Sequence, residues 1–286
     1  MDTQAKIIVV GNKKGGAGKT TFSIHAAGTL HRYGKKVLLI EQDTQGSISD
    51  AHRLRIKFVG TPSFDYHFQT KRLDRDEVMK LAEGYDFVVV DSPPGTAKDP
   101  NDSRPDDDIV PGSTKAAIRP ETLYSFTAAD LIVIPTKMNR TDMHSVANYL
   151  NICATHLGIL HKANVSPTRH AVVIPNELDP KWGYSKERNI IMRSVEKCDK
   201  NRGLVTLANT PIIKYRRYSD LQWDGKTAAD LGEDRARYLF EKTLFEDVLP
   251  KVGFSDPRTK AEKKRANEYF KQTVMKIYGG EDVCVA

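Results

Sequence analysis

The chain has 286 residues, of which 39% are hydrophobic and 28% are charged. This length and composition exclude a disordered chain and a membrane-spanning one, and leave enough apolar surface to fold without disulfides or a structural metal. Lysine and arginine number 44 against 37 aspartate and glutamate, and the net charge of +7 points weakly to an anionic partner, either nucleic acid or an acidic membrane surface.

Short apolar runs alternate with amphipathic segments along the chain. The runs lie at 6–10, 36–40, 87–90, 131–134 and 171–174, and they are nearly continuous, which is typical of parallel strands buried on both faces. Helices are expected at about 20–33, 142–157, 186–200 and 231–249. The alternation predicts an α/β fold: a doubly wound, mostly parallel sheet with helices on both faces.

Two regions fall outside this alternation. Residues 98–120 are rich in proline and acidic at their start, and predict a long loop that is either a solvated excursion or a lid or docking element. Residues 255–286 form a basic tail in which 262–278 place apolar side chains on one helical face. This helix is expected to pack on the body, to bind DNA or a partner, or to lie on a membrane. The remainder, 1–254, is predicted to be one domain.

The strongest motif follows the first predicted strand and opens the first predicted helix. Its residues are Lys14, Gly15, Gly16, Ala17, Gly18, Lys19, Thr20 and Thr21. Glycines let backbone N–H groups curl around phosphate oxygens, and the helix N-terminus attracts the same anion. We expect Lys19 to reach the β- and γ-phosphates and the Thr20 hydroxyl to bind Mg²⁺. The motif therefore predicts a site for ATP and Mg²⁺.

Two acidic residues follow predicted strands at the edge of the sheet where ligands of open α/β folds bind. Asp43 comes after the second run, and it is either a functional carboxylate of the ligand site or a helix N-cap. Asp91 ends the strand of Tyr85-Asp86-Phe87-Val88-Val89-Val90-Asp91-Ser92-Pro93-Pro94. An acid at the end of a hydrophobic strand is the Walker B arrangement, which holds Mg²⁺ through a water.

These motifs together resemble the ParA/MinD family of Walker-type ATPases, whose phosphate loop reads K-G-G-x-G-K-T-T. Lys13 stands where the general phosphate loop has its first glycine. The resemblance implies that Lys14 is the signature lysine, which in family dimers crosses to the phosphates of the partner. The family motif D-x-D-P-Q-G places Asp43 at the second carboxylate, which in the family orients or activates the attacking water. Glu41 and Thr44 depart from the pattern.

The resemblance runs from about residue 6 to 250 and implies further contacts. Asn176 would face the adenine, and backbone near Pro211 would border it. Asn209-Thr210-Pro211-Ile212-Ile213 resembles the family's late strand, and Gly225-Lys226-Thr227 its G-[KR]-[TS] turn. The DNA surface would include Lys214, Arg216 and Arg217, whose charges neutralise phosphates without reading sequence.

The family resemblance implies a slow, partner-stimulated ATP hydrolase that dimerises with ATP, binds DNA non-specifically, and segregates or positions cargo such as a plasmid. A stimulating adaptor protein is expected, and so is a cytoplasmic, nucleoid-associated location. The phosphate loop lies too near the start for an N-terminal helix-turn-helix, which suggests the small class of partition ATPase. The alternative is an ATPase that positions a conjugation, secretion or cell-envelope complex through protein partners. A metabolic enzyme of the same fold is a third possibility that Lys14 disfavours.

The cysteines agree with this location. Cys153, Cys198 and Cys284 are odd in number and far apart, which fits neither a disulfide framework nor a zinc site. We expect three reduced thiols.

Overall fold

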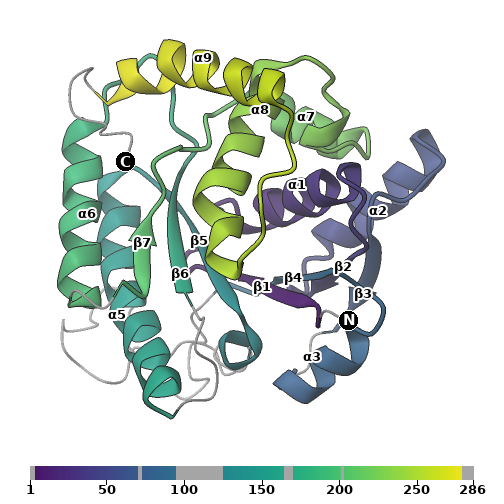
Figure 1. Ribbon diagram of the computed structural model, residues 1–286, viewed down its shortest axis with the longest axis horizontal. Coiled ribbons are helices and arrows are strands. Elements are labelled where there is room, and N and C mark those ends of the chain that lie inside the picture. Colours follow the sequence, from purple (N-terminus) through teal and green to yellow (C-terminus); the bar gives the residue numbers. More distant parts are fainter. Residues whose placement is uncertain (1–3, 70–72, 95–124, 164–169, 201–202, 279–286) are drawn as a thin grey trace.

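Seven parallel strands form one sheet in the order β3-β2-β4-β1-β5-β6-β7 (Figure 1). The computed structural model describes residues 4–69, 73–94, 125–163, 170–200 and 203–278, so the predicted insert at 98–120 lies outside the described residues. Strand pairing is parallel at every described junction. The strands are β1 (Lys6–Val10), β2 (Val37–Glu41), β3 (Asp65–Phe68), β4 (Phe87–Asp91), β5 (Leu131–Lys137), β6 (His170–Asn176) and β7 (Val205–Leu207).

Helices cover both faces of the sheet, as Figure 1 shows. They are α1 (Lys19–Arg32), α2 (Ser47–Phe58), α3 (Arg75–Leu81), α5 (Arg140–Lys162), α6 (Ser185–Asp199), α7 (Arg216–Trp223), α8 (Arg235–Lys242) and α9 (Lys260–Ile277). In β1, Ile7 and Val9 join the core beneath α3, α5, α6 and α9, whereas Ile8 and Val10 join the core beneath α1, α2, α7 and α8. Because successive strand residues point to opposite faces, a continuous apolar run fills both cores. The predicted fold class is confirmed.

Two strands escaped the sequence analysis because both are short and lie at the edges of the sheet. β3 has no buried residue, and β7 has three residues of which only Val205 is buried. The late strand expected at 209–213 is wrong: the strand is β7, and 209–213 is a loop in which Ile213 makes a single bridge to Leu178. Sparse burial leaves little apolar pattern to recognise.

The helix expected at 231–249 is also different in the structure. α8 begins at Arg235, where Asp234 caps it by accepting from the Ala236 N–H at 2.7 Å. The chain then widens into a π-helical turn, η2 (Thr243–Val248), and tightens into the 3₁₀ turn η3 (Leu249–Val252). Helical periodicity does not distinguish a π turn from an α turn, so the sequence predicted one uninterrupted helix.

The tail helix packs on the body of the protein. Ala266, Phe270, Val274, Ile277 and Tyr278 are buried, and they belong to the core that includes α5 and α6. These residues lie on the apolar face expected for 262–278. The helix begins with Thr259 and Glu262 exchanging side-chain and backbone hydrogen bonds of 2.9 to 3.2 Å. Within the described residues, no helix is both long and apolar enough to cross a membrane.

Candidate functional site

The phosphate loop lies between the end of β1 and the start of α1, as predicted. Gly16 and Gly18 have φ of 70° and 94°, values that favour glycine. A Cβ added to Gly15 or Gly16 would meet no atom within 4 Å, so the loop is open on that side. Gly18 is the N-cap of α1, and no described side chain bonds to that helix end. The first N–H groups of α1 therefore remain available to an anion.

Lys19 is buried inside this loop. Its Nζ donates to the Lys14 carbonyl at 3.3 Å, and the residue is 6% exposed. Burial lowers the pKa of Lys19, while the negative charges of Asp91 and Asp43 raise it. A buried ammonium group beside the free N–H groups at the start of α1 is suited to binding phosphate oxygens.

Asp91 lies at the end of β4 and receives two hydroxyl groups from α1. Thr20 Oγ1 donates to Asp91 Oδ2 at 2.7 Å, and Ser23 Oγ donates to Asp91 Oδ1 at 3.0 Å. The carboxyl is fully buried, and burial raises its pKa to about 7. These hard oxygen donors fit Mg²⁺, which prefers carboxylate, hydroxyl and water ligands. Sequence reasoning paired Thr20 with Asp91 but missed Ser23.

Asp43 is half-buried in the loop between β2 and α2. Its Oδ1 accepts from the Gln45 N–H at 3.1 Å, and the N-cap position of α2 is Gly46. Asp43 therefore does not cap α2, which was one of its two predicted roles. The negative charge of Asp43 raises the pKa of Lys19, so the two side chains interact electrostatically.

Glu41, the departure from the family motif, holds the start of α2. It is 1% exposed and accepts from the N–H groups of Ile48 at 2.8 Å and Ser49 at 3.2 Å. Tyr66 on β3 donates its hydroxyl to the same carboxylate at 2.7 Å. Glu41 thus satisfies helix N–H groups that Gly46 cannot bond through a side chain.

Lys14 is engaged within its own chain. Its Nζ forms an ion pair with Asp142, in the first turn of α5. Asn139 fixes that carboxylate by donating from Nδ2 to Asp142 Oδ2 at 2.9 Å. The lysine side chain is 41% exposed and the aspartate 6% exposed. Sequence reasoning missed Asp142 because nothing in the local pattern connects it to the phosphate loop.

Asn176 contacts the phosphate loop directly. Its Nδ2 donates to the Ala17 carbonyl at 2.7 Å, and a Cβ on Gly18 would lie 2.0 Å from the same nitrogen. The next residue, Glu177, has φ of 57°, a strained value for a side chain, and pairs with Lys137 at 2.9 Å. The strained residue therefore directly follows the asparagine that bonds to the phosphate loop.

Pro211 lies beside this turn. It is buried, and the following Ile212 N–H donates to the Pro175 carbonyl at 2.8 Å. The structure thus brings the two residues expected at the adenine close together: Asn176 ends β6, and Pro211 lies in the segment that follows β7.

The predicted DNA-binding residues lie around the start of α7. Lys214 is exposed, and its N–H donates to the Leu178 carbonyl at 2.8 Å. Arg216 and Arg217 form the first turn of α7. All three therefore follow the loop that contains Pro211.

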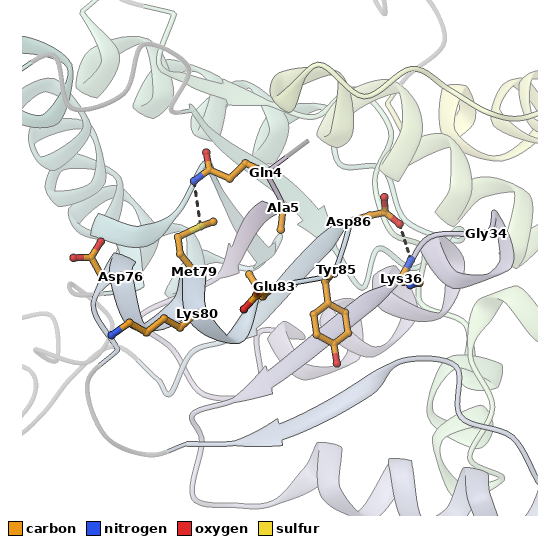
Figure 2. A pocket seen from close by; sticks show the side chains of 12 residues that line it. Gln4, Ala5, Gly34, Lys36, Asp76, Met79, Lys80, Glu83, Tyr85 and Asp86 are labelled. Carbon is orange, nitrogen blue, oxygen red and sulfur yellow. Dashed lines mark hydrogen bonds between the residues drawn. The ribbon is translucent and has the colours of Figure 1, made fainter. Parts of the chain in front are cut away.

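A hollow of about 1150 Å³ lies at the amino ends of β1, β2 and β4 (Figure 2). Gln4, Lys36 and Asp86 line it just ahead of β1, β2 and β4, and α3 forms its wall. Lys36 N donates to Asp86 Oδ2 at 2.8 Å there. The phosphate loop follows the other end of β1, so this hollow is separate from the candidate site.

Comparisons with known proteins agree with this geometry. A family model described as an AAA domain matches residues 5–60. The chain is 27% identical over 169 residues to the chromosome-partitioning ATPase Soj of Thermus thermophilus, covering 50% of this chain and 59% of Soj. It is 28% identical over 248 residues to the maintenance of carboxysome distribution protein A of Gloeobacter kilaueensis, covering 82% of this chain and 93% of that one.

Solved structures show the same fold. The ATP complex of a singly substituted McdA from Cyanothece superposes with a TM-score of 0.55 at 16% identity, covering 88% of this chain and 98% of that one. MinD of Aquifex aeolicus superposes with a TM-score of 0.52 at 18% identity, covering 89% of this chain and 100% of that one.

The sheet order, phosphate loop and Walker B acid define a P-loop NTPase fold. Within that class, the chain is similar to ATPases of the ParA/MinD family, and its matches to two proteins named Soj agree with the resemblance found in the sequence. The match to Soj spans less than two thirds of that relative's length.

Proposed function

We propose that the chain binds Mg²⁺ and ATP in the phosphate loop and hydrolyses the nucleotide. The contact between Thr20 Oγ1 and Asp91 Oδ2, at 2.7 Å beside the buried Lys19, carries the proposal. It joins the two groups that a P-loop ATPase uses for Mg²⁺ next to the lysine that it uses for phosphate. The proposed nucleotide site comprises Gly15, Gly16, Ala17, Gly18, Lys19, Thr20, Thr21, Asn176 and Pro211.

In the proposed reaction, Lys19 holds the β- and γ-phosphates and Asp43 orients the attacking water. Thr20 and Asp91 would hold Mg²⁺, which supplies neutralisation of the charge that develops on the phosphate oxygens. Asp43 is half-buried and acts electrostatically on Lys19, which supports a position near the γ-phosphate. Without a partner the rate is slow, since no second cation has reached the phosphates.

That second cation is Lys14 of a second copy. In the proposed cycle, ATP promotes a homodimer in which Lys14 leaves Asp142 of its own chain and reaches the partner's phosphates. A cation supplied across an interface in this way accelerates phosphoryl transfer by about 10³ to 10⁵. The ion pair with Asp142 supports a monomer in which Lys14 is held back.

The ATP-bound dimer is proposed to bind DNA without sequence preference through Lys214, Arg216 and Arg217. An adaptor protein would stimulate hydrolysis and release the dimer, and the cycle would segregate a plasmid. Two relatives, named for chromosome partitioning and carboxysome distribution, support a role in positioning cargo. The proposed location is the cytoplasm, on the nucleoid.

The test measures ATP binding and ATP-dependent retention on DNA. Lys19→Ala should lose both, whereas Lys57→Ala, an exposed lysine on α2, should lose neither. If about five phosphates are contacted, log K should fall with log salt at a slope of about −4.5. Unchanged ATP binding in Lys19→Ala would overturn the proposal.

ATP binding without DNA retention would favour the alternative function. If ATP is bound but DNA is never retained at any salt concentration, the switch acts through protein partners. The cargo would then be a conjugation, secretion or cell-envelope complex.

A further inference from the structure

The π-helical turn η2 anchors the loop at 209–211. Asp247 on η2 accepts the Asn209 N–H on Oδ1 at 3.1 Å and the Thr210 N–H on Oδ2 at 2.9 Å. The Thr243 hydroxyl, at the start of η2, lies 3.2 Å from the Thr210 carbonyl and 3.1 Å from the Leu239 carbonyl, so the two acceptors share its one proton. Both polar groups of the Thr210 backbone therefore contact this one turn.

The same loop reaches the phosphate loop by a short path. Ile212, just after it, donates to the Pro175 carbonyl at 2.8 Å, and the neighbouring Asn176 donates to the Ala17 carbonyl at 2.7 Å. The end of β6, residues 175 and 176, therefore connects the 209–211 loop to the phosphate loop through hydrogen bonds.

The sheet order places the loop on the side where a base must lie. Asp91 and Asp43 follow β4 and β2, on one side of β1, and they mark the metal and γ-phosphate end. β5, β6 and β7 lie on the other side of β1. A nucleotide whose triphosphate points towards Asp91 therefore extends its base towards the loops after β6 and β7.

Helix α6 supplies a third anchor. Arg188 Nη2 donates to Asn209 Oδ1 at 3.4 Å, and the guanidinium lies 5.2 Å from the ring centre of Tyr278, the residue after α9. Arg188 therefore connects the 209–211 loop to the end of α9.

The carboxylate of Asp247 depends on these bonds. Burial raises its pKa, and the N–H groups of Thr210 and Asn209 lower it. A desolvated carboxylate that accepts two backbone N–H groups is costly to leave unpaired, so it holds the loop in one position. π-helical turns are rare and recur at functional sites.

We propose that Asp247 and Thr243 are positioning residues for the nucleotide base, because they hold the 209–211 loop where that base binds. The inference rests on the ATP binding proposed above. Within the described residues, the side-chain hydrogen bonds of η2 do not reach the phosphate loop or Asp91, so its effect should be confined to the nucleoside half of the ligand.

Tripolyphosphate separates the two halves, because it offers the phosphate loop the same charges but no base. Dissociation constants for Mg-ATP and for Mg-tripolyphosphate are measured by calorimetry on the full chain. Asp247→Asn should weaken ATP about tenfold, the size expected for one charge-assisted hydrogen bond, and leave tripolyphosphate within twofold. Glu246→Gln is the matched control, because Glu246 lies on the same turn but pairs with Lys242 and Arg258. It should change neither constant.

Equal weakening of both ligands by Asp247→Asn, or no weakening of ATP, would overturn the inference. Thr243→Val provides a second variant should Asp247→Asn fold poorly, since it removes one hydroxyl at constant volume. It should weaken ATP about threefold and leave tripolyphosphate unchanged, and an unchanged ATP constant refutes the role of Thr243. If the unmodified chain binds tripolyphosphate and ATP equally, the base contributes nothing and this inference fails alone. If it binds neither, the proposed function fails.

Discussion

Removing the charge of Asp142 should strengthen the ATP-dependent dimer. In the single chain, Asp142 pairs with Lys14, and the proposed dimer requires Lys14 to leave. Asp142→Asn keeps the size of the side chain and an oxygen that can accept from Asn139 Nδ2, a bond of 2.9 Å. The substitution therefore releases Lys14 while retaining the start of α5.

The magnitude follows from the burial of the two partners. Exposed ion pairs contribute about 0.2 to 1 kcal/mol, whereas breaking a buried pair costs about 3 to 5 kcal/mol. Here the carboxylate is 6% exposed and the lysine 41% exposed, so we expect an intermediate cost of about 1 to 2 kcal/mol. Because 1.4 kcal/mol is a factor of ten, the variant should dimerise about 5- to 30-fold more tightly for each lysine released.

Sedimentation equilibrium with ATP measures this constant, in an Asp43→Ala background that slows hydrolysis. Asp50→Asn is the control, because Asp50 is 67% exposed and pairs only with Arg53 among the described residues. The increase in dimer affinity caused by Asp142→Asn must vanish when Lys14→Gln is also present. A gain of the same size in that background, or no gain at all, refutes the idea that Asp142 restrains Lys14.

Three further variants test the packing around the site. Burial lowers the pKa of His25 to about 4, so between pH 6.5 and 4 the unfolded chain binds a proton that the folded chain does not. Stability should therefore fall by about 3 kcal/mol as the pH drops through this window, and urea unfolding of His25→Gln should show a flatter pH profile. Gly225→Ala should lower the free energy of unfolding by about 2 to 4 kcal/mol in the same assay, because φ is 65° and the new Cβ would lie 2.1 Å from Arg55 N. A loss under about 1 kcal/mol would contradict this. Glu177→Gly should raise the melting temperature slightly. Relief of the strain at its φ of 57° is worth about 1 kcal/mol, whereas loss of the partly exposed ion pair with Lys137 costs less than that. A clear fall in the melting temperature would argue against strain at Glu177.

Features that are contiguous in the sequence could be predicted well. The phosphate loop from Lys14 to Thr21 and the strand ending at Asp91 each combine an apolar run with a fixed spacing of polar residues, and both lie where expected. β3 and β7 could not be found in the same way, because edge strands bury few side chains and so carry almost no apolar pattern.

Contacts between distant residues were beyond the sequence. The ion pair of Lys14 with Asp142, and the bonds of Asp247 to the 209–211 loop, join segments that only the sheet order brings together. The π turn that carries Asp247 was predicted as ordinary helix, since its apolar spacing continues that of α8. Long-range polar contacts leave no periodic signal, so the sequence predicted the phosphate loop but not the contacts that support the residues around it.

Glu41 shows how a departure from a motif can be explained once its neighbours are known. The helix that follows, α2, has Gly46 at its N-cap position, and glycine has no side chain to bond the free N–H groups of the first turn. Glu41 bonds two of them from the end of β2, and Tyr66 supports it from β3. The unusual acid and the missing cap thus compensate for each other, and the short loop between them, which contains Asp43, is fixed at both ends. The position of the proposed water-orienting group therefore depends on the edge strand of the sheet.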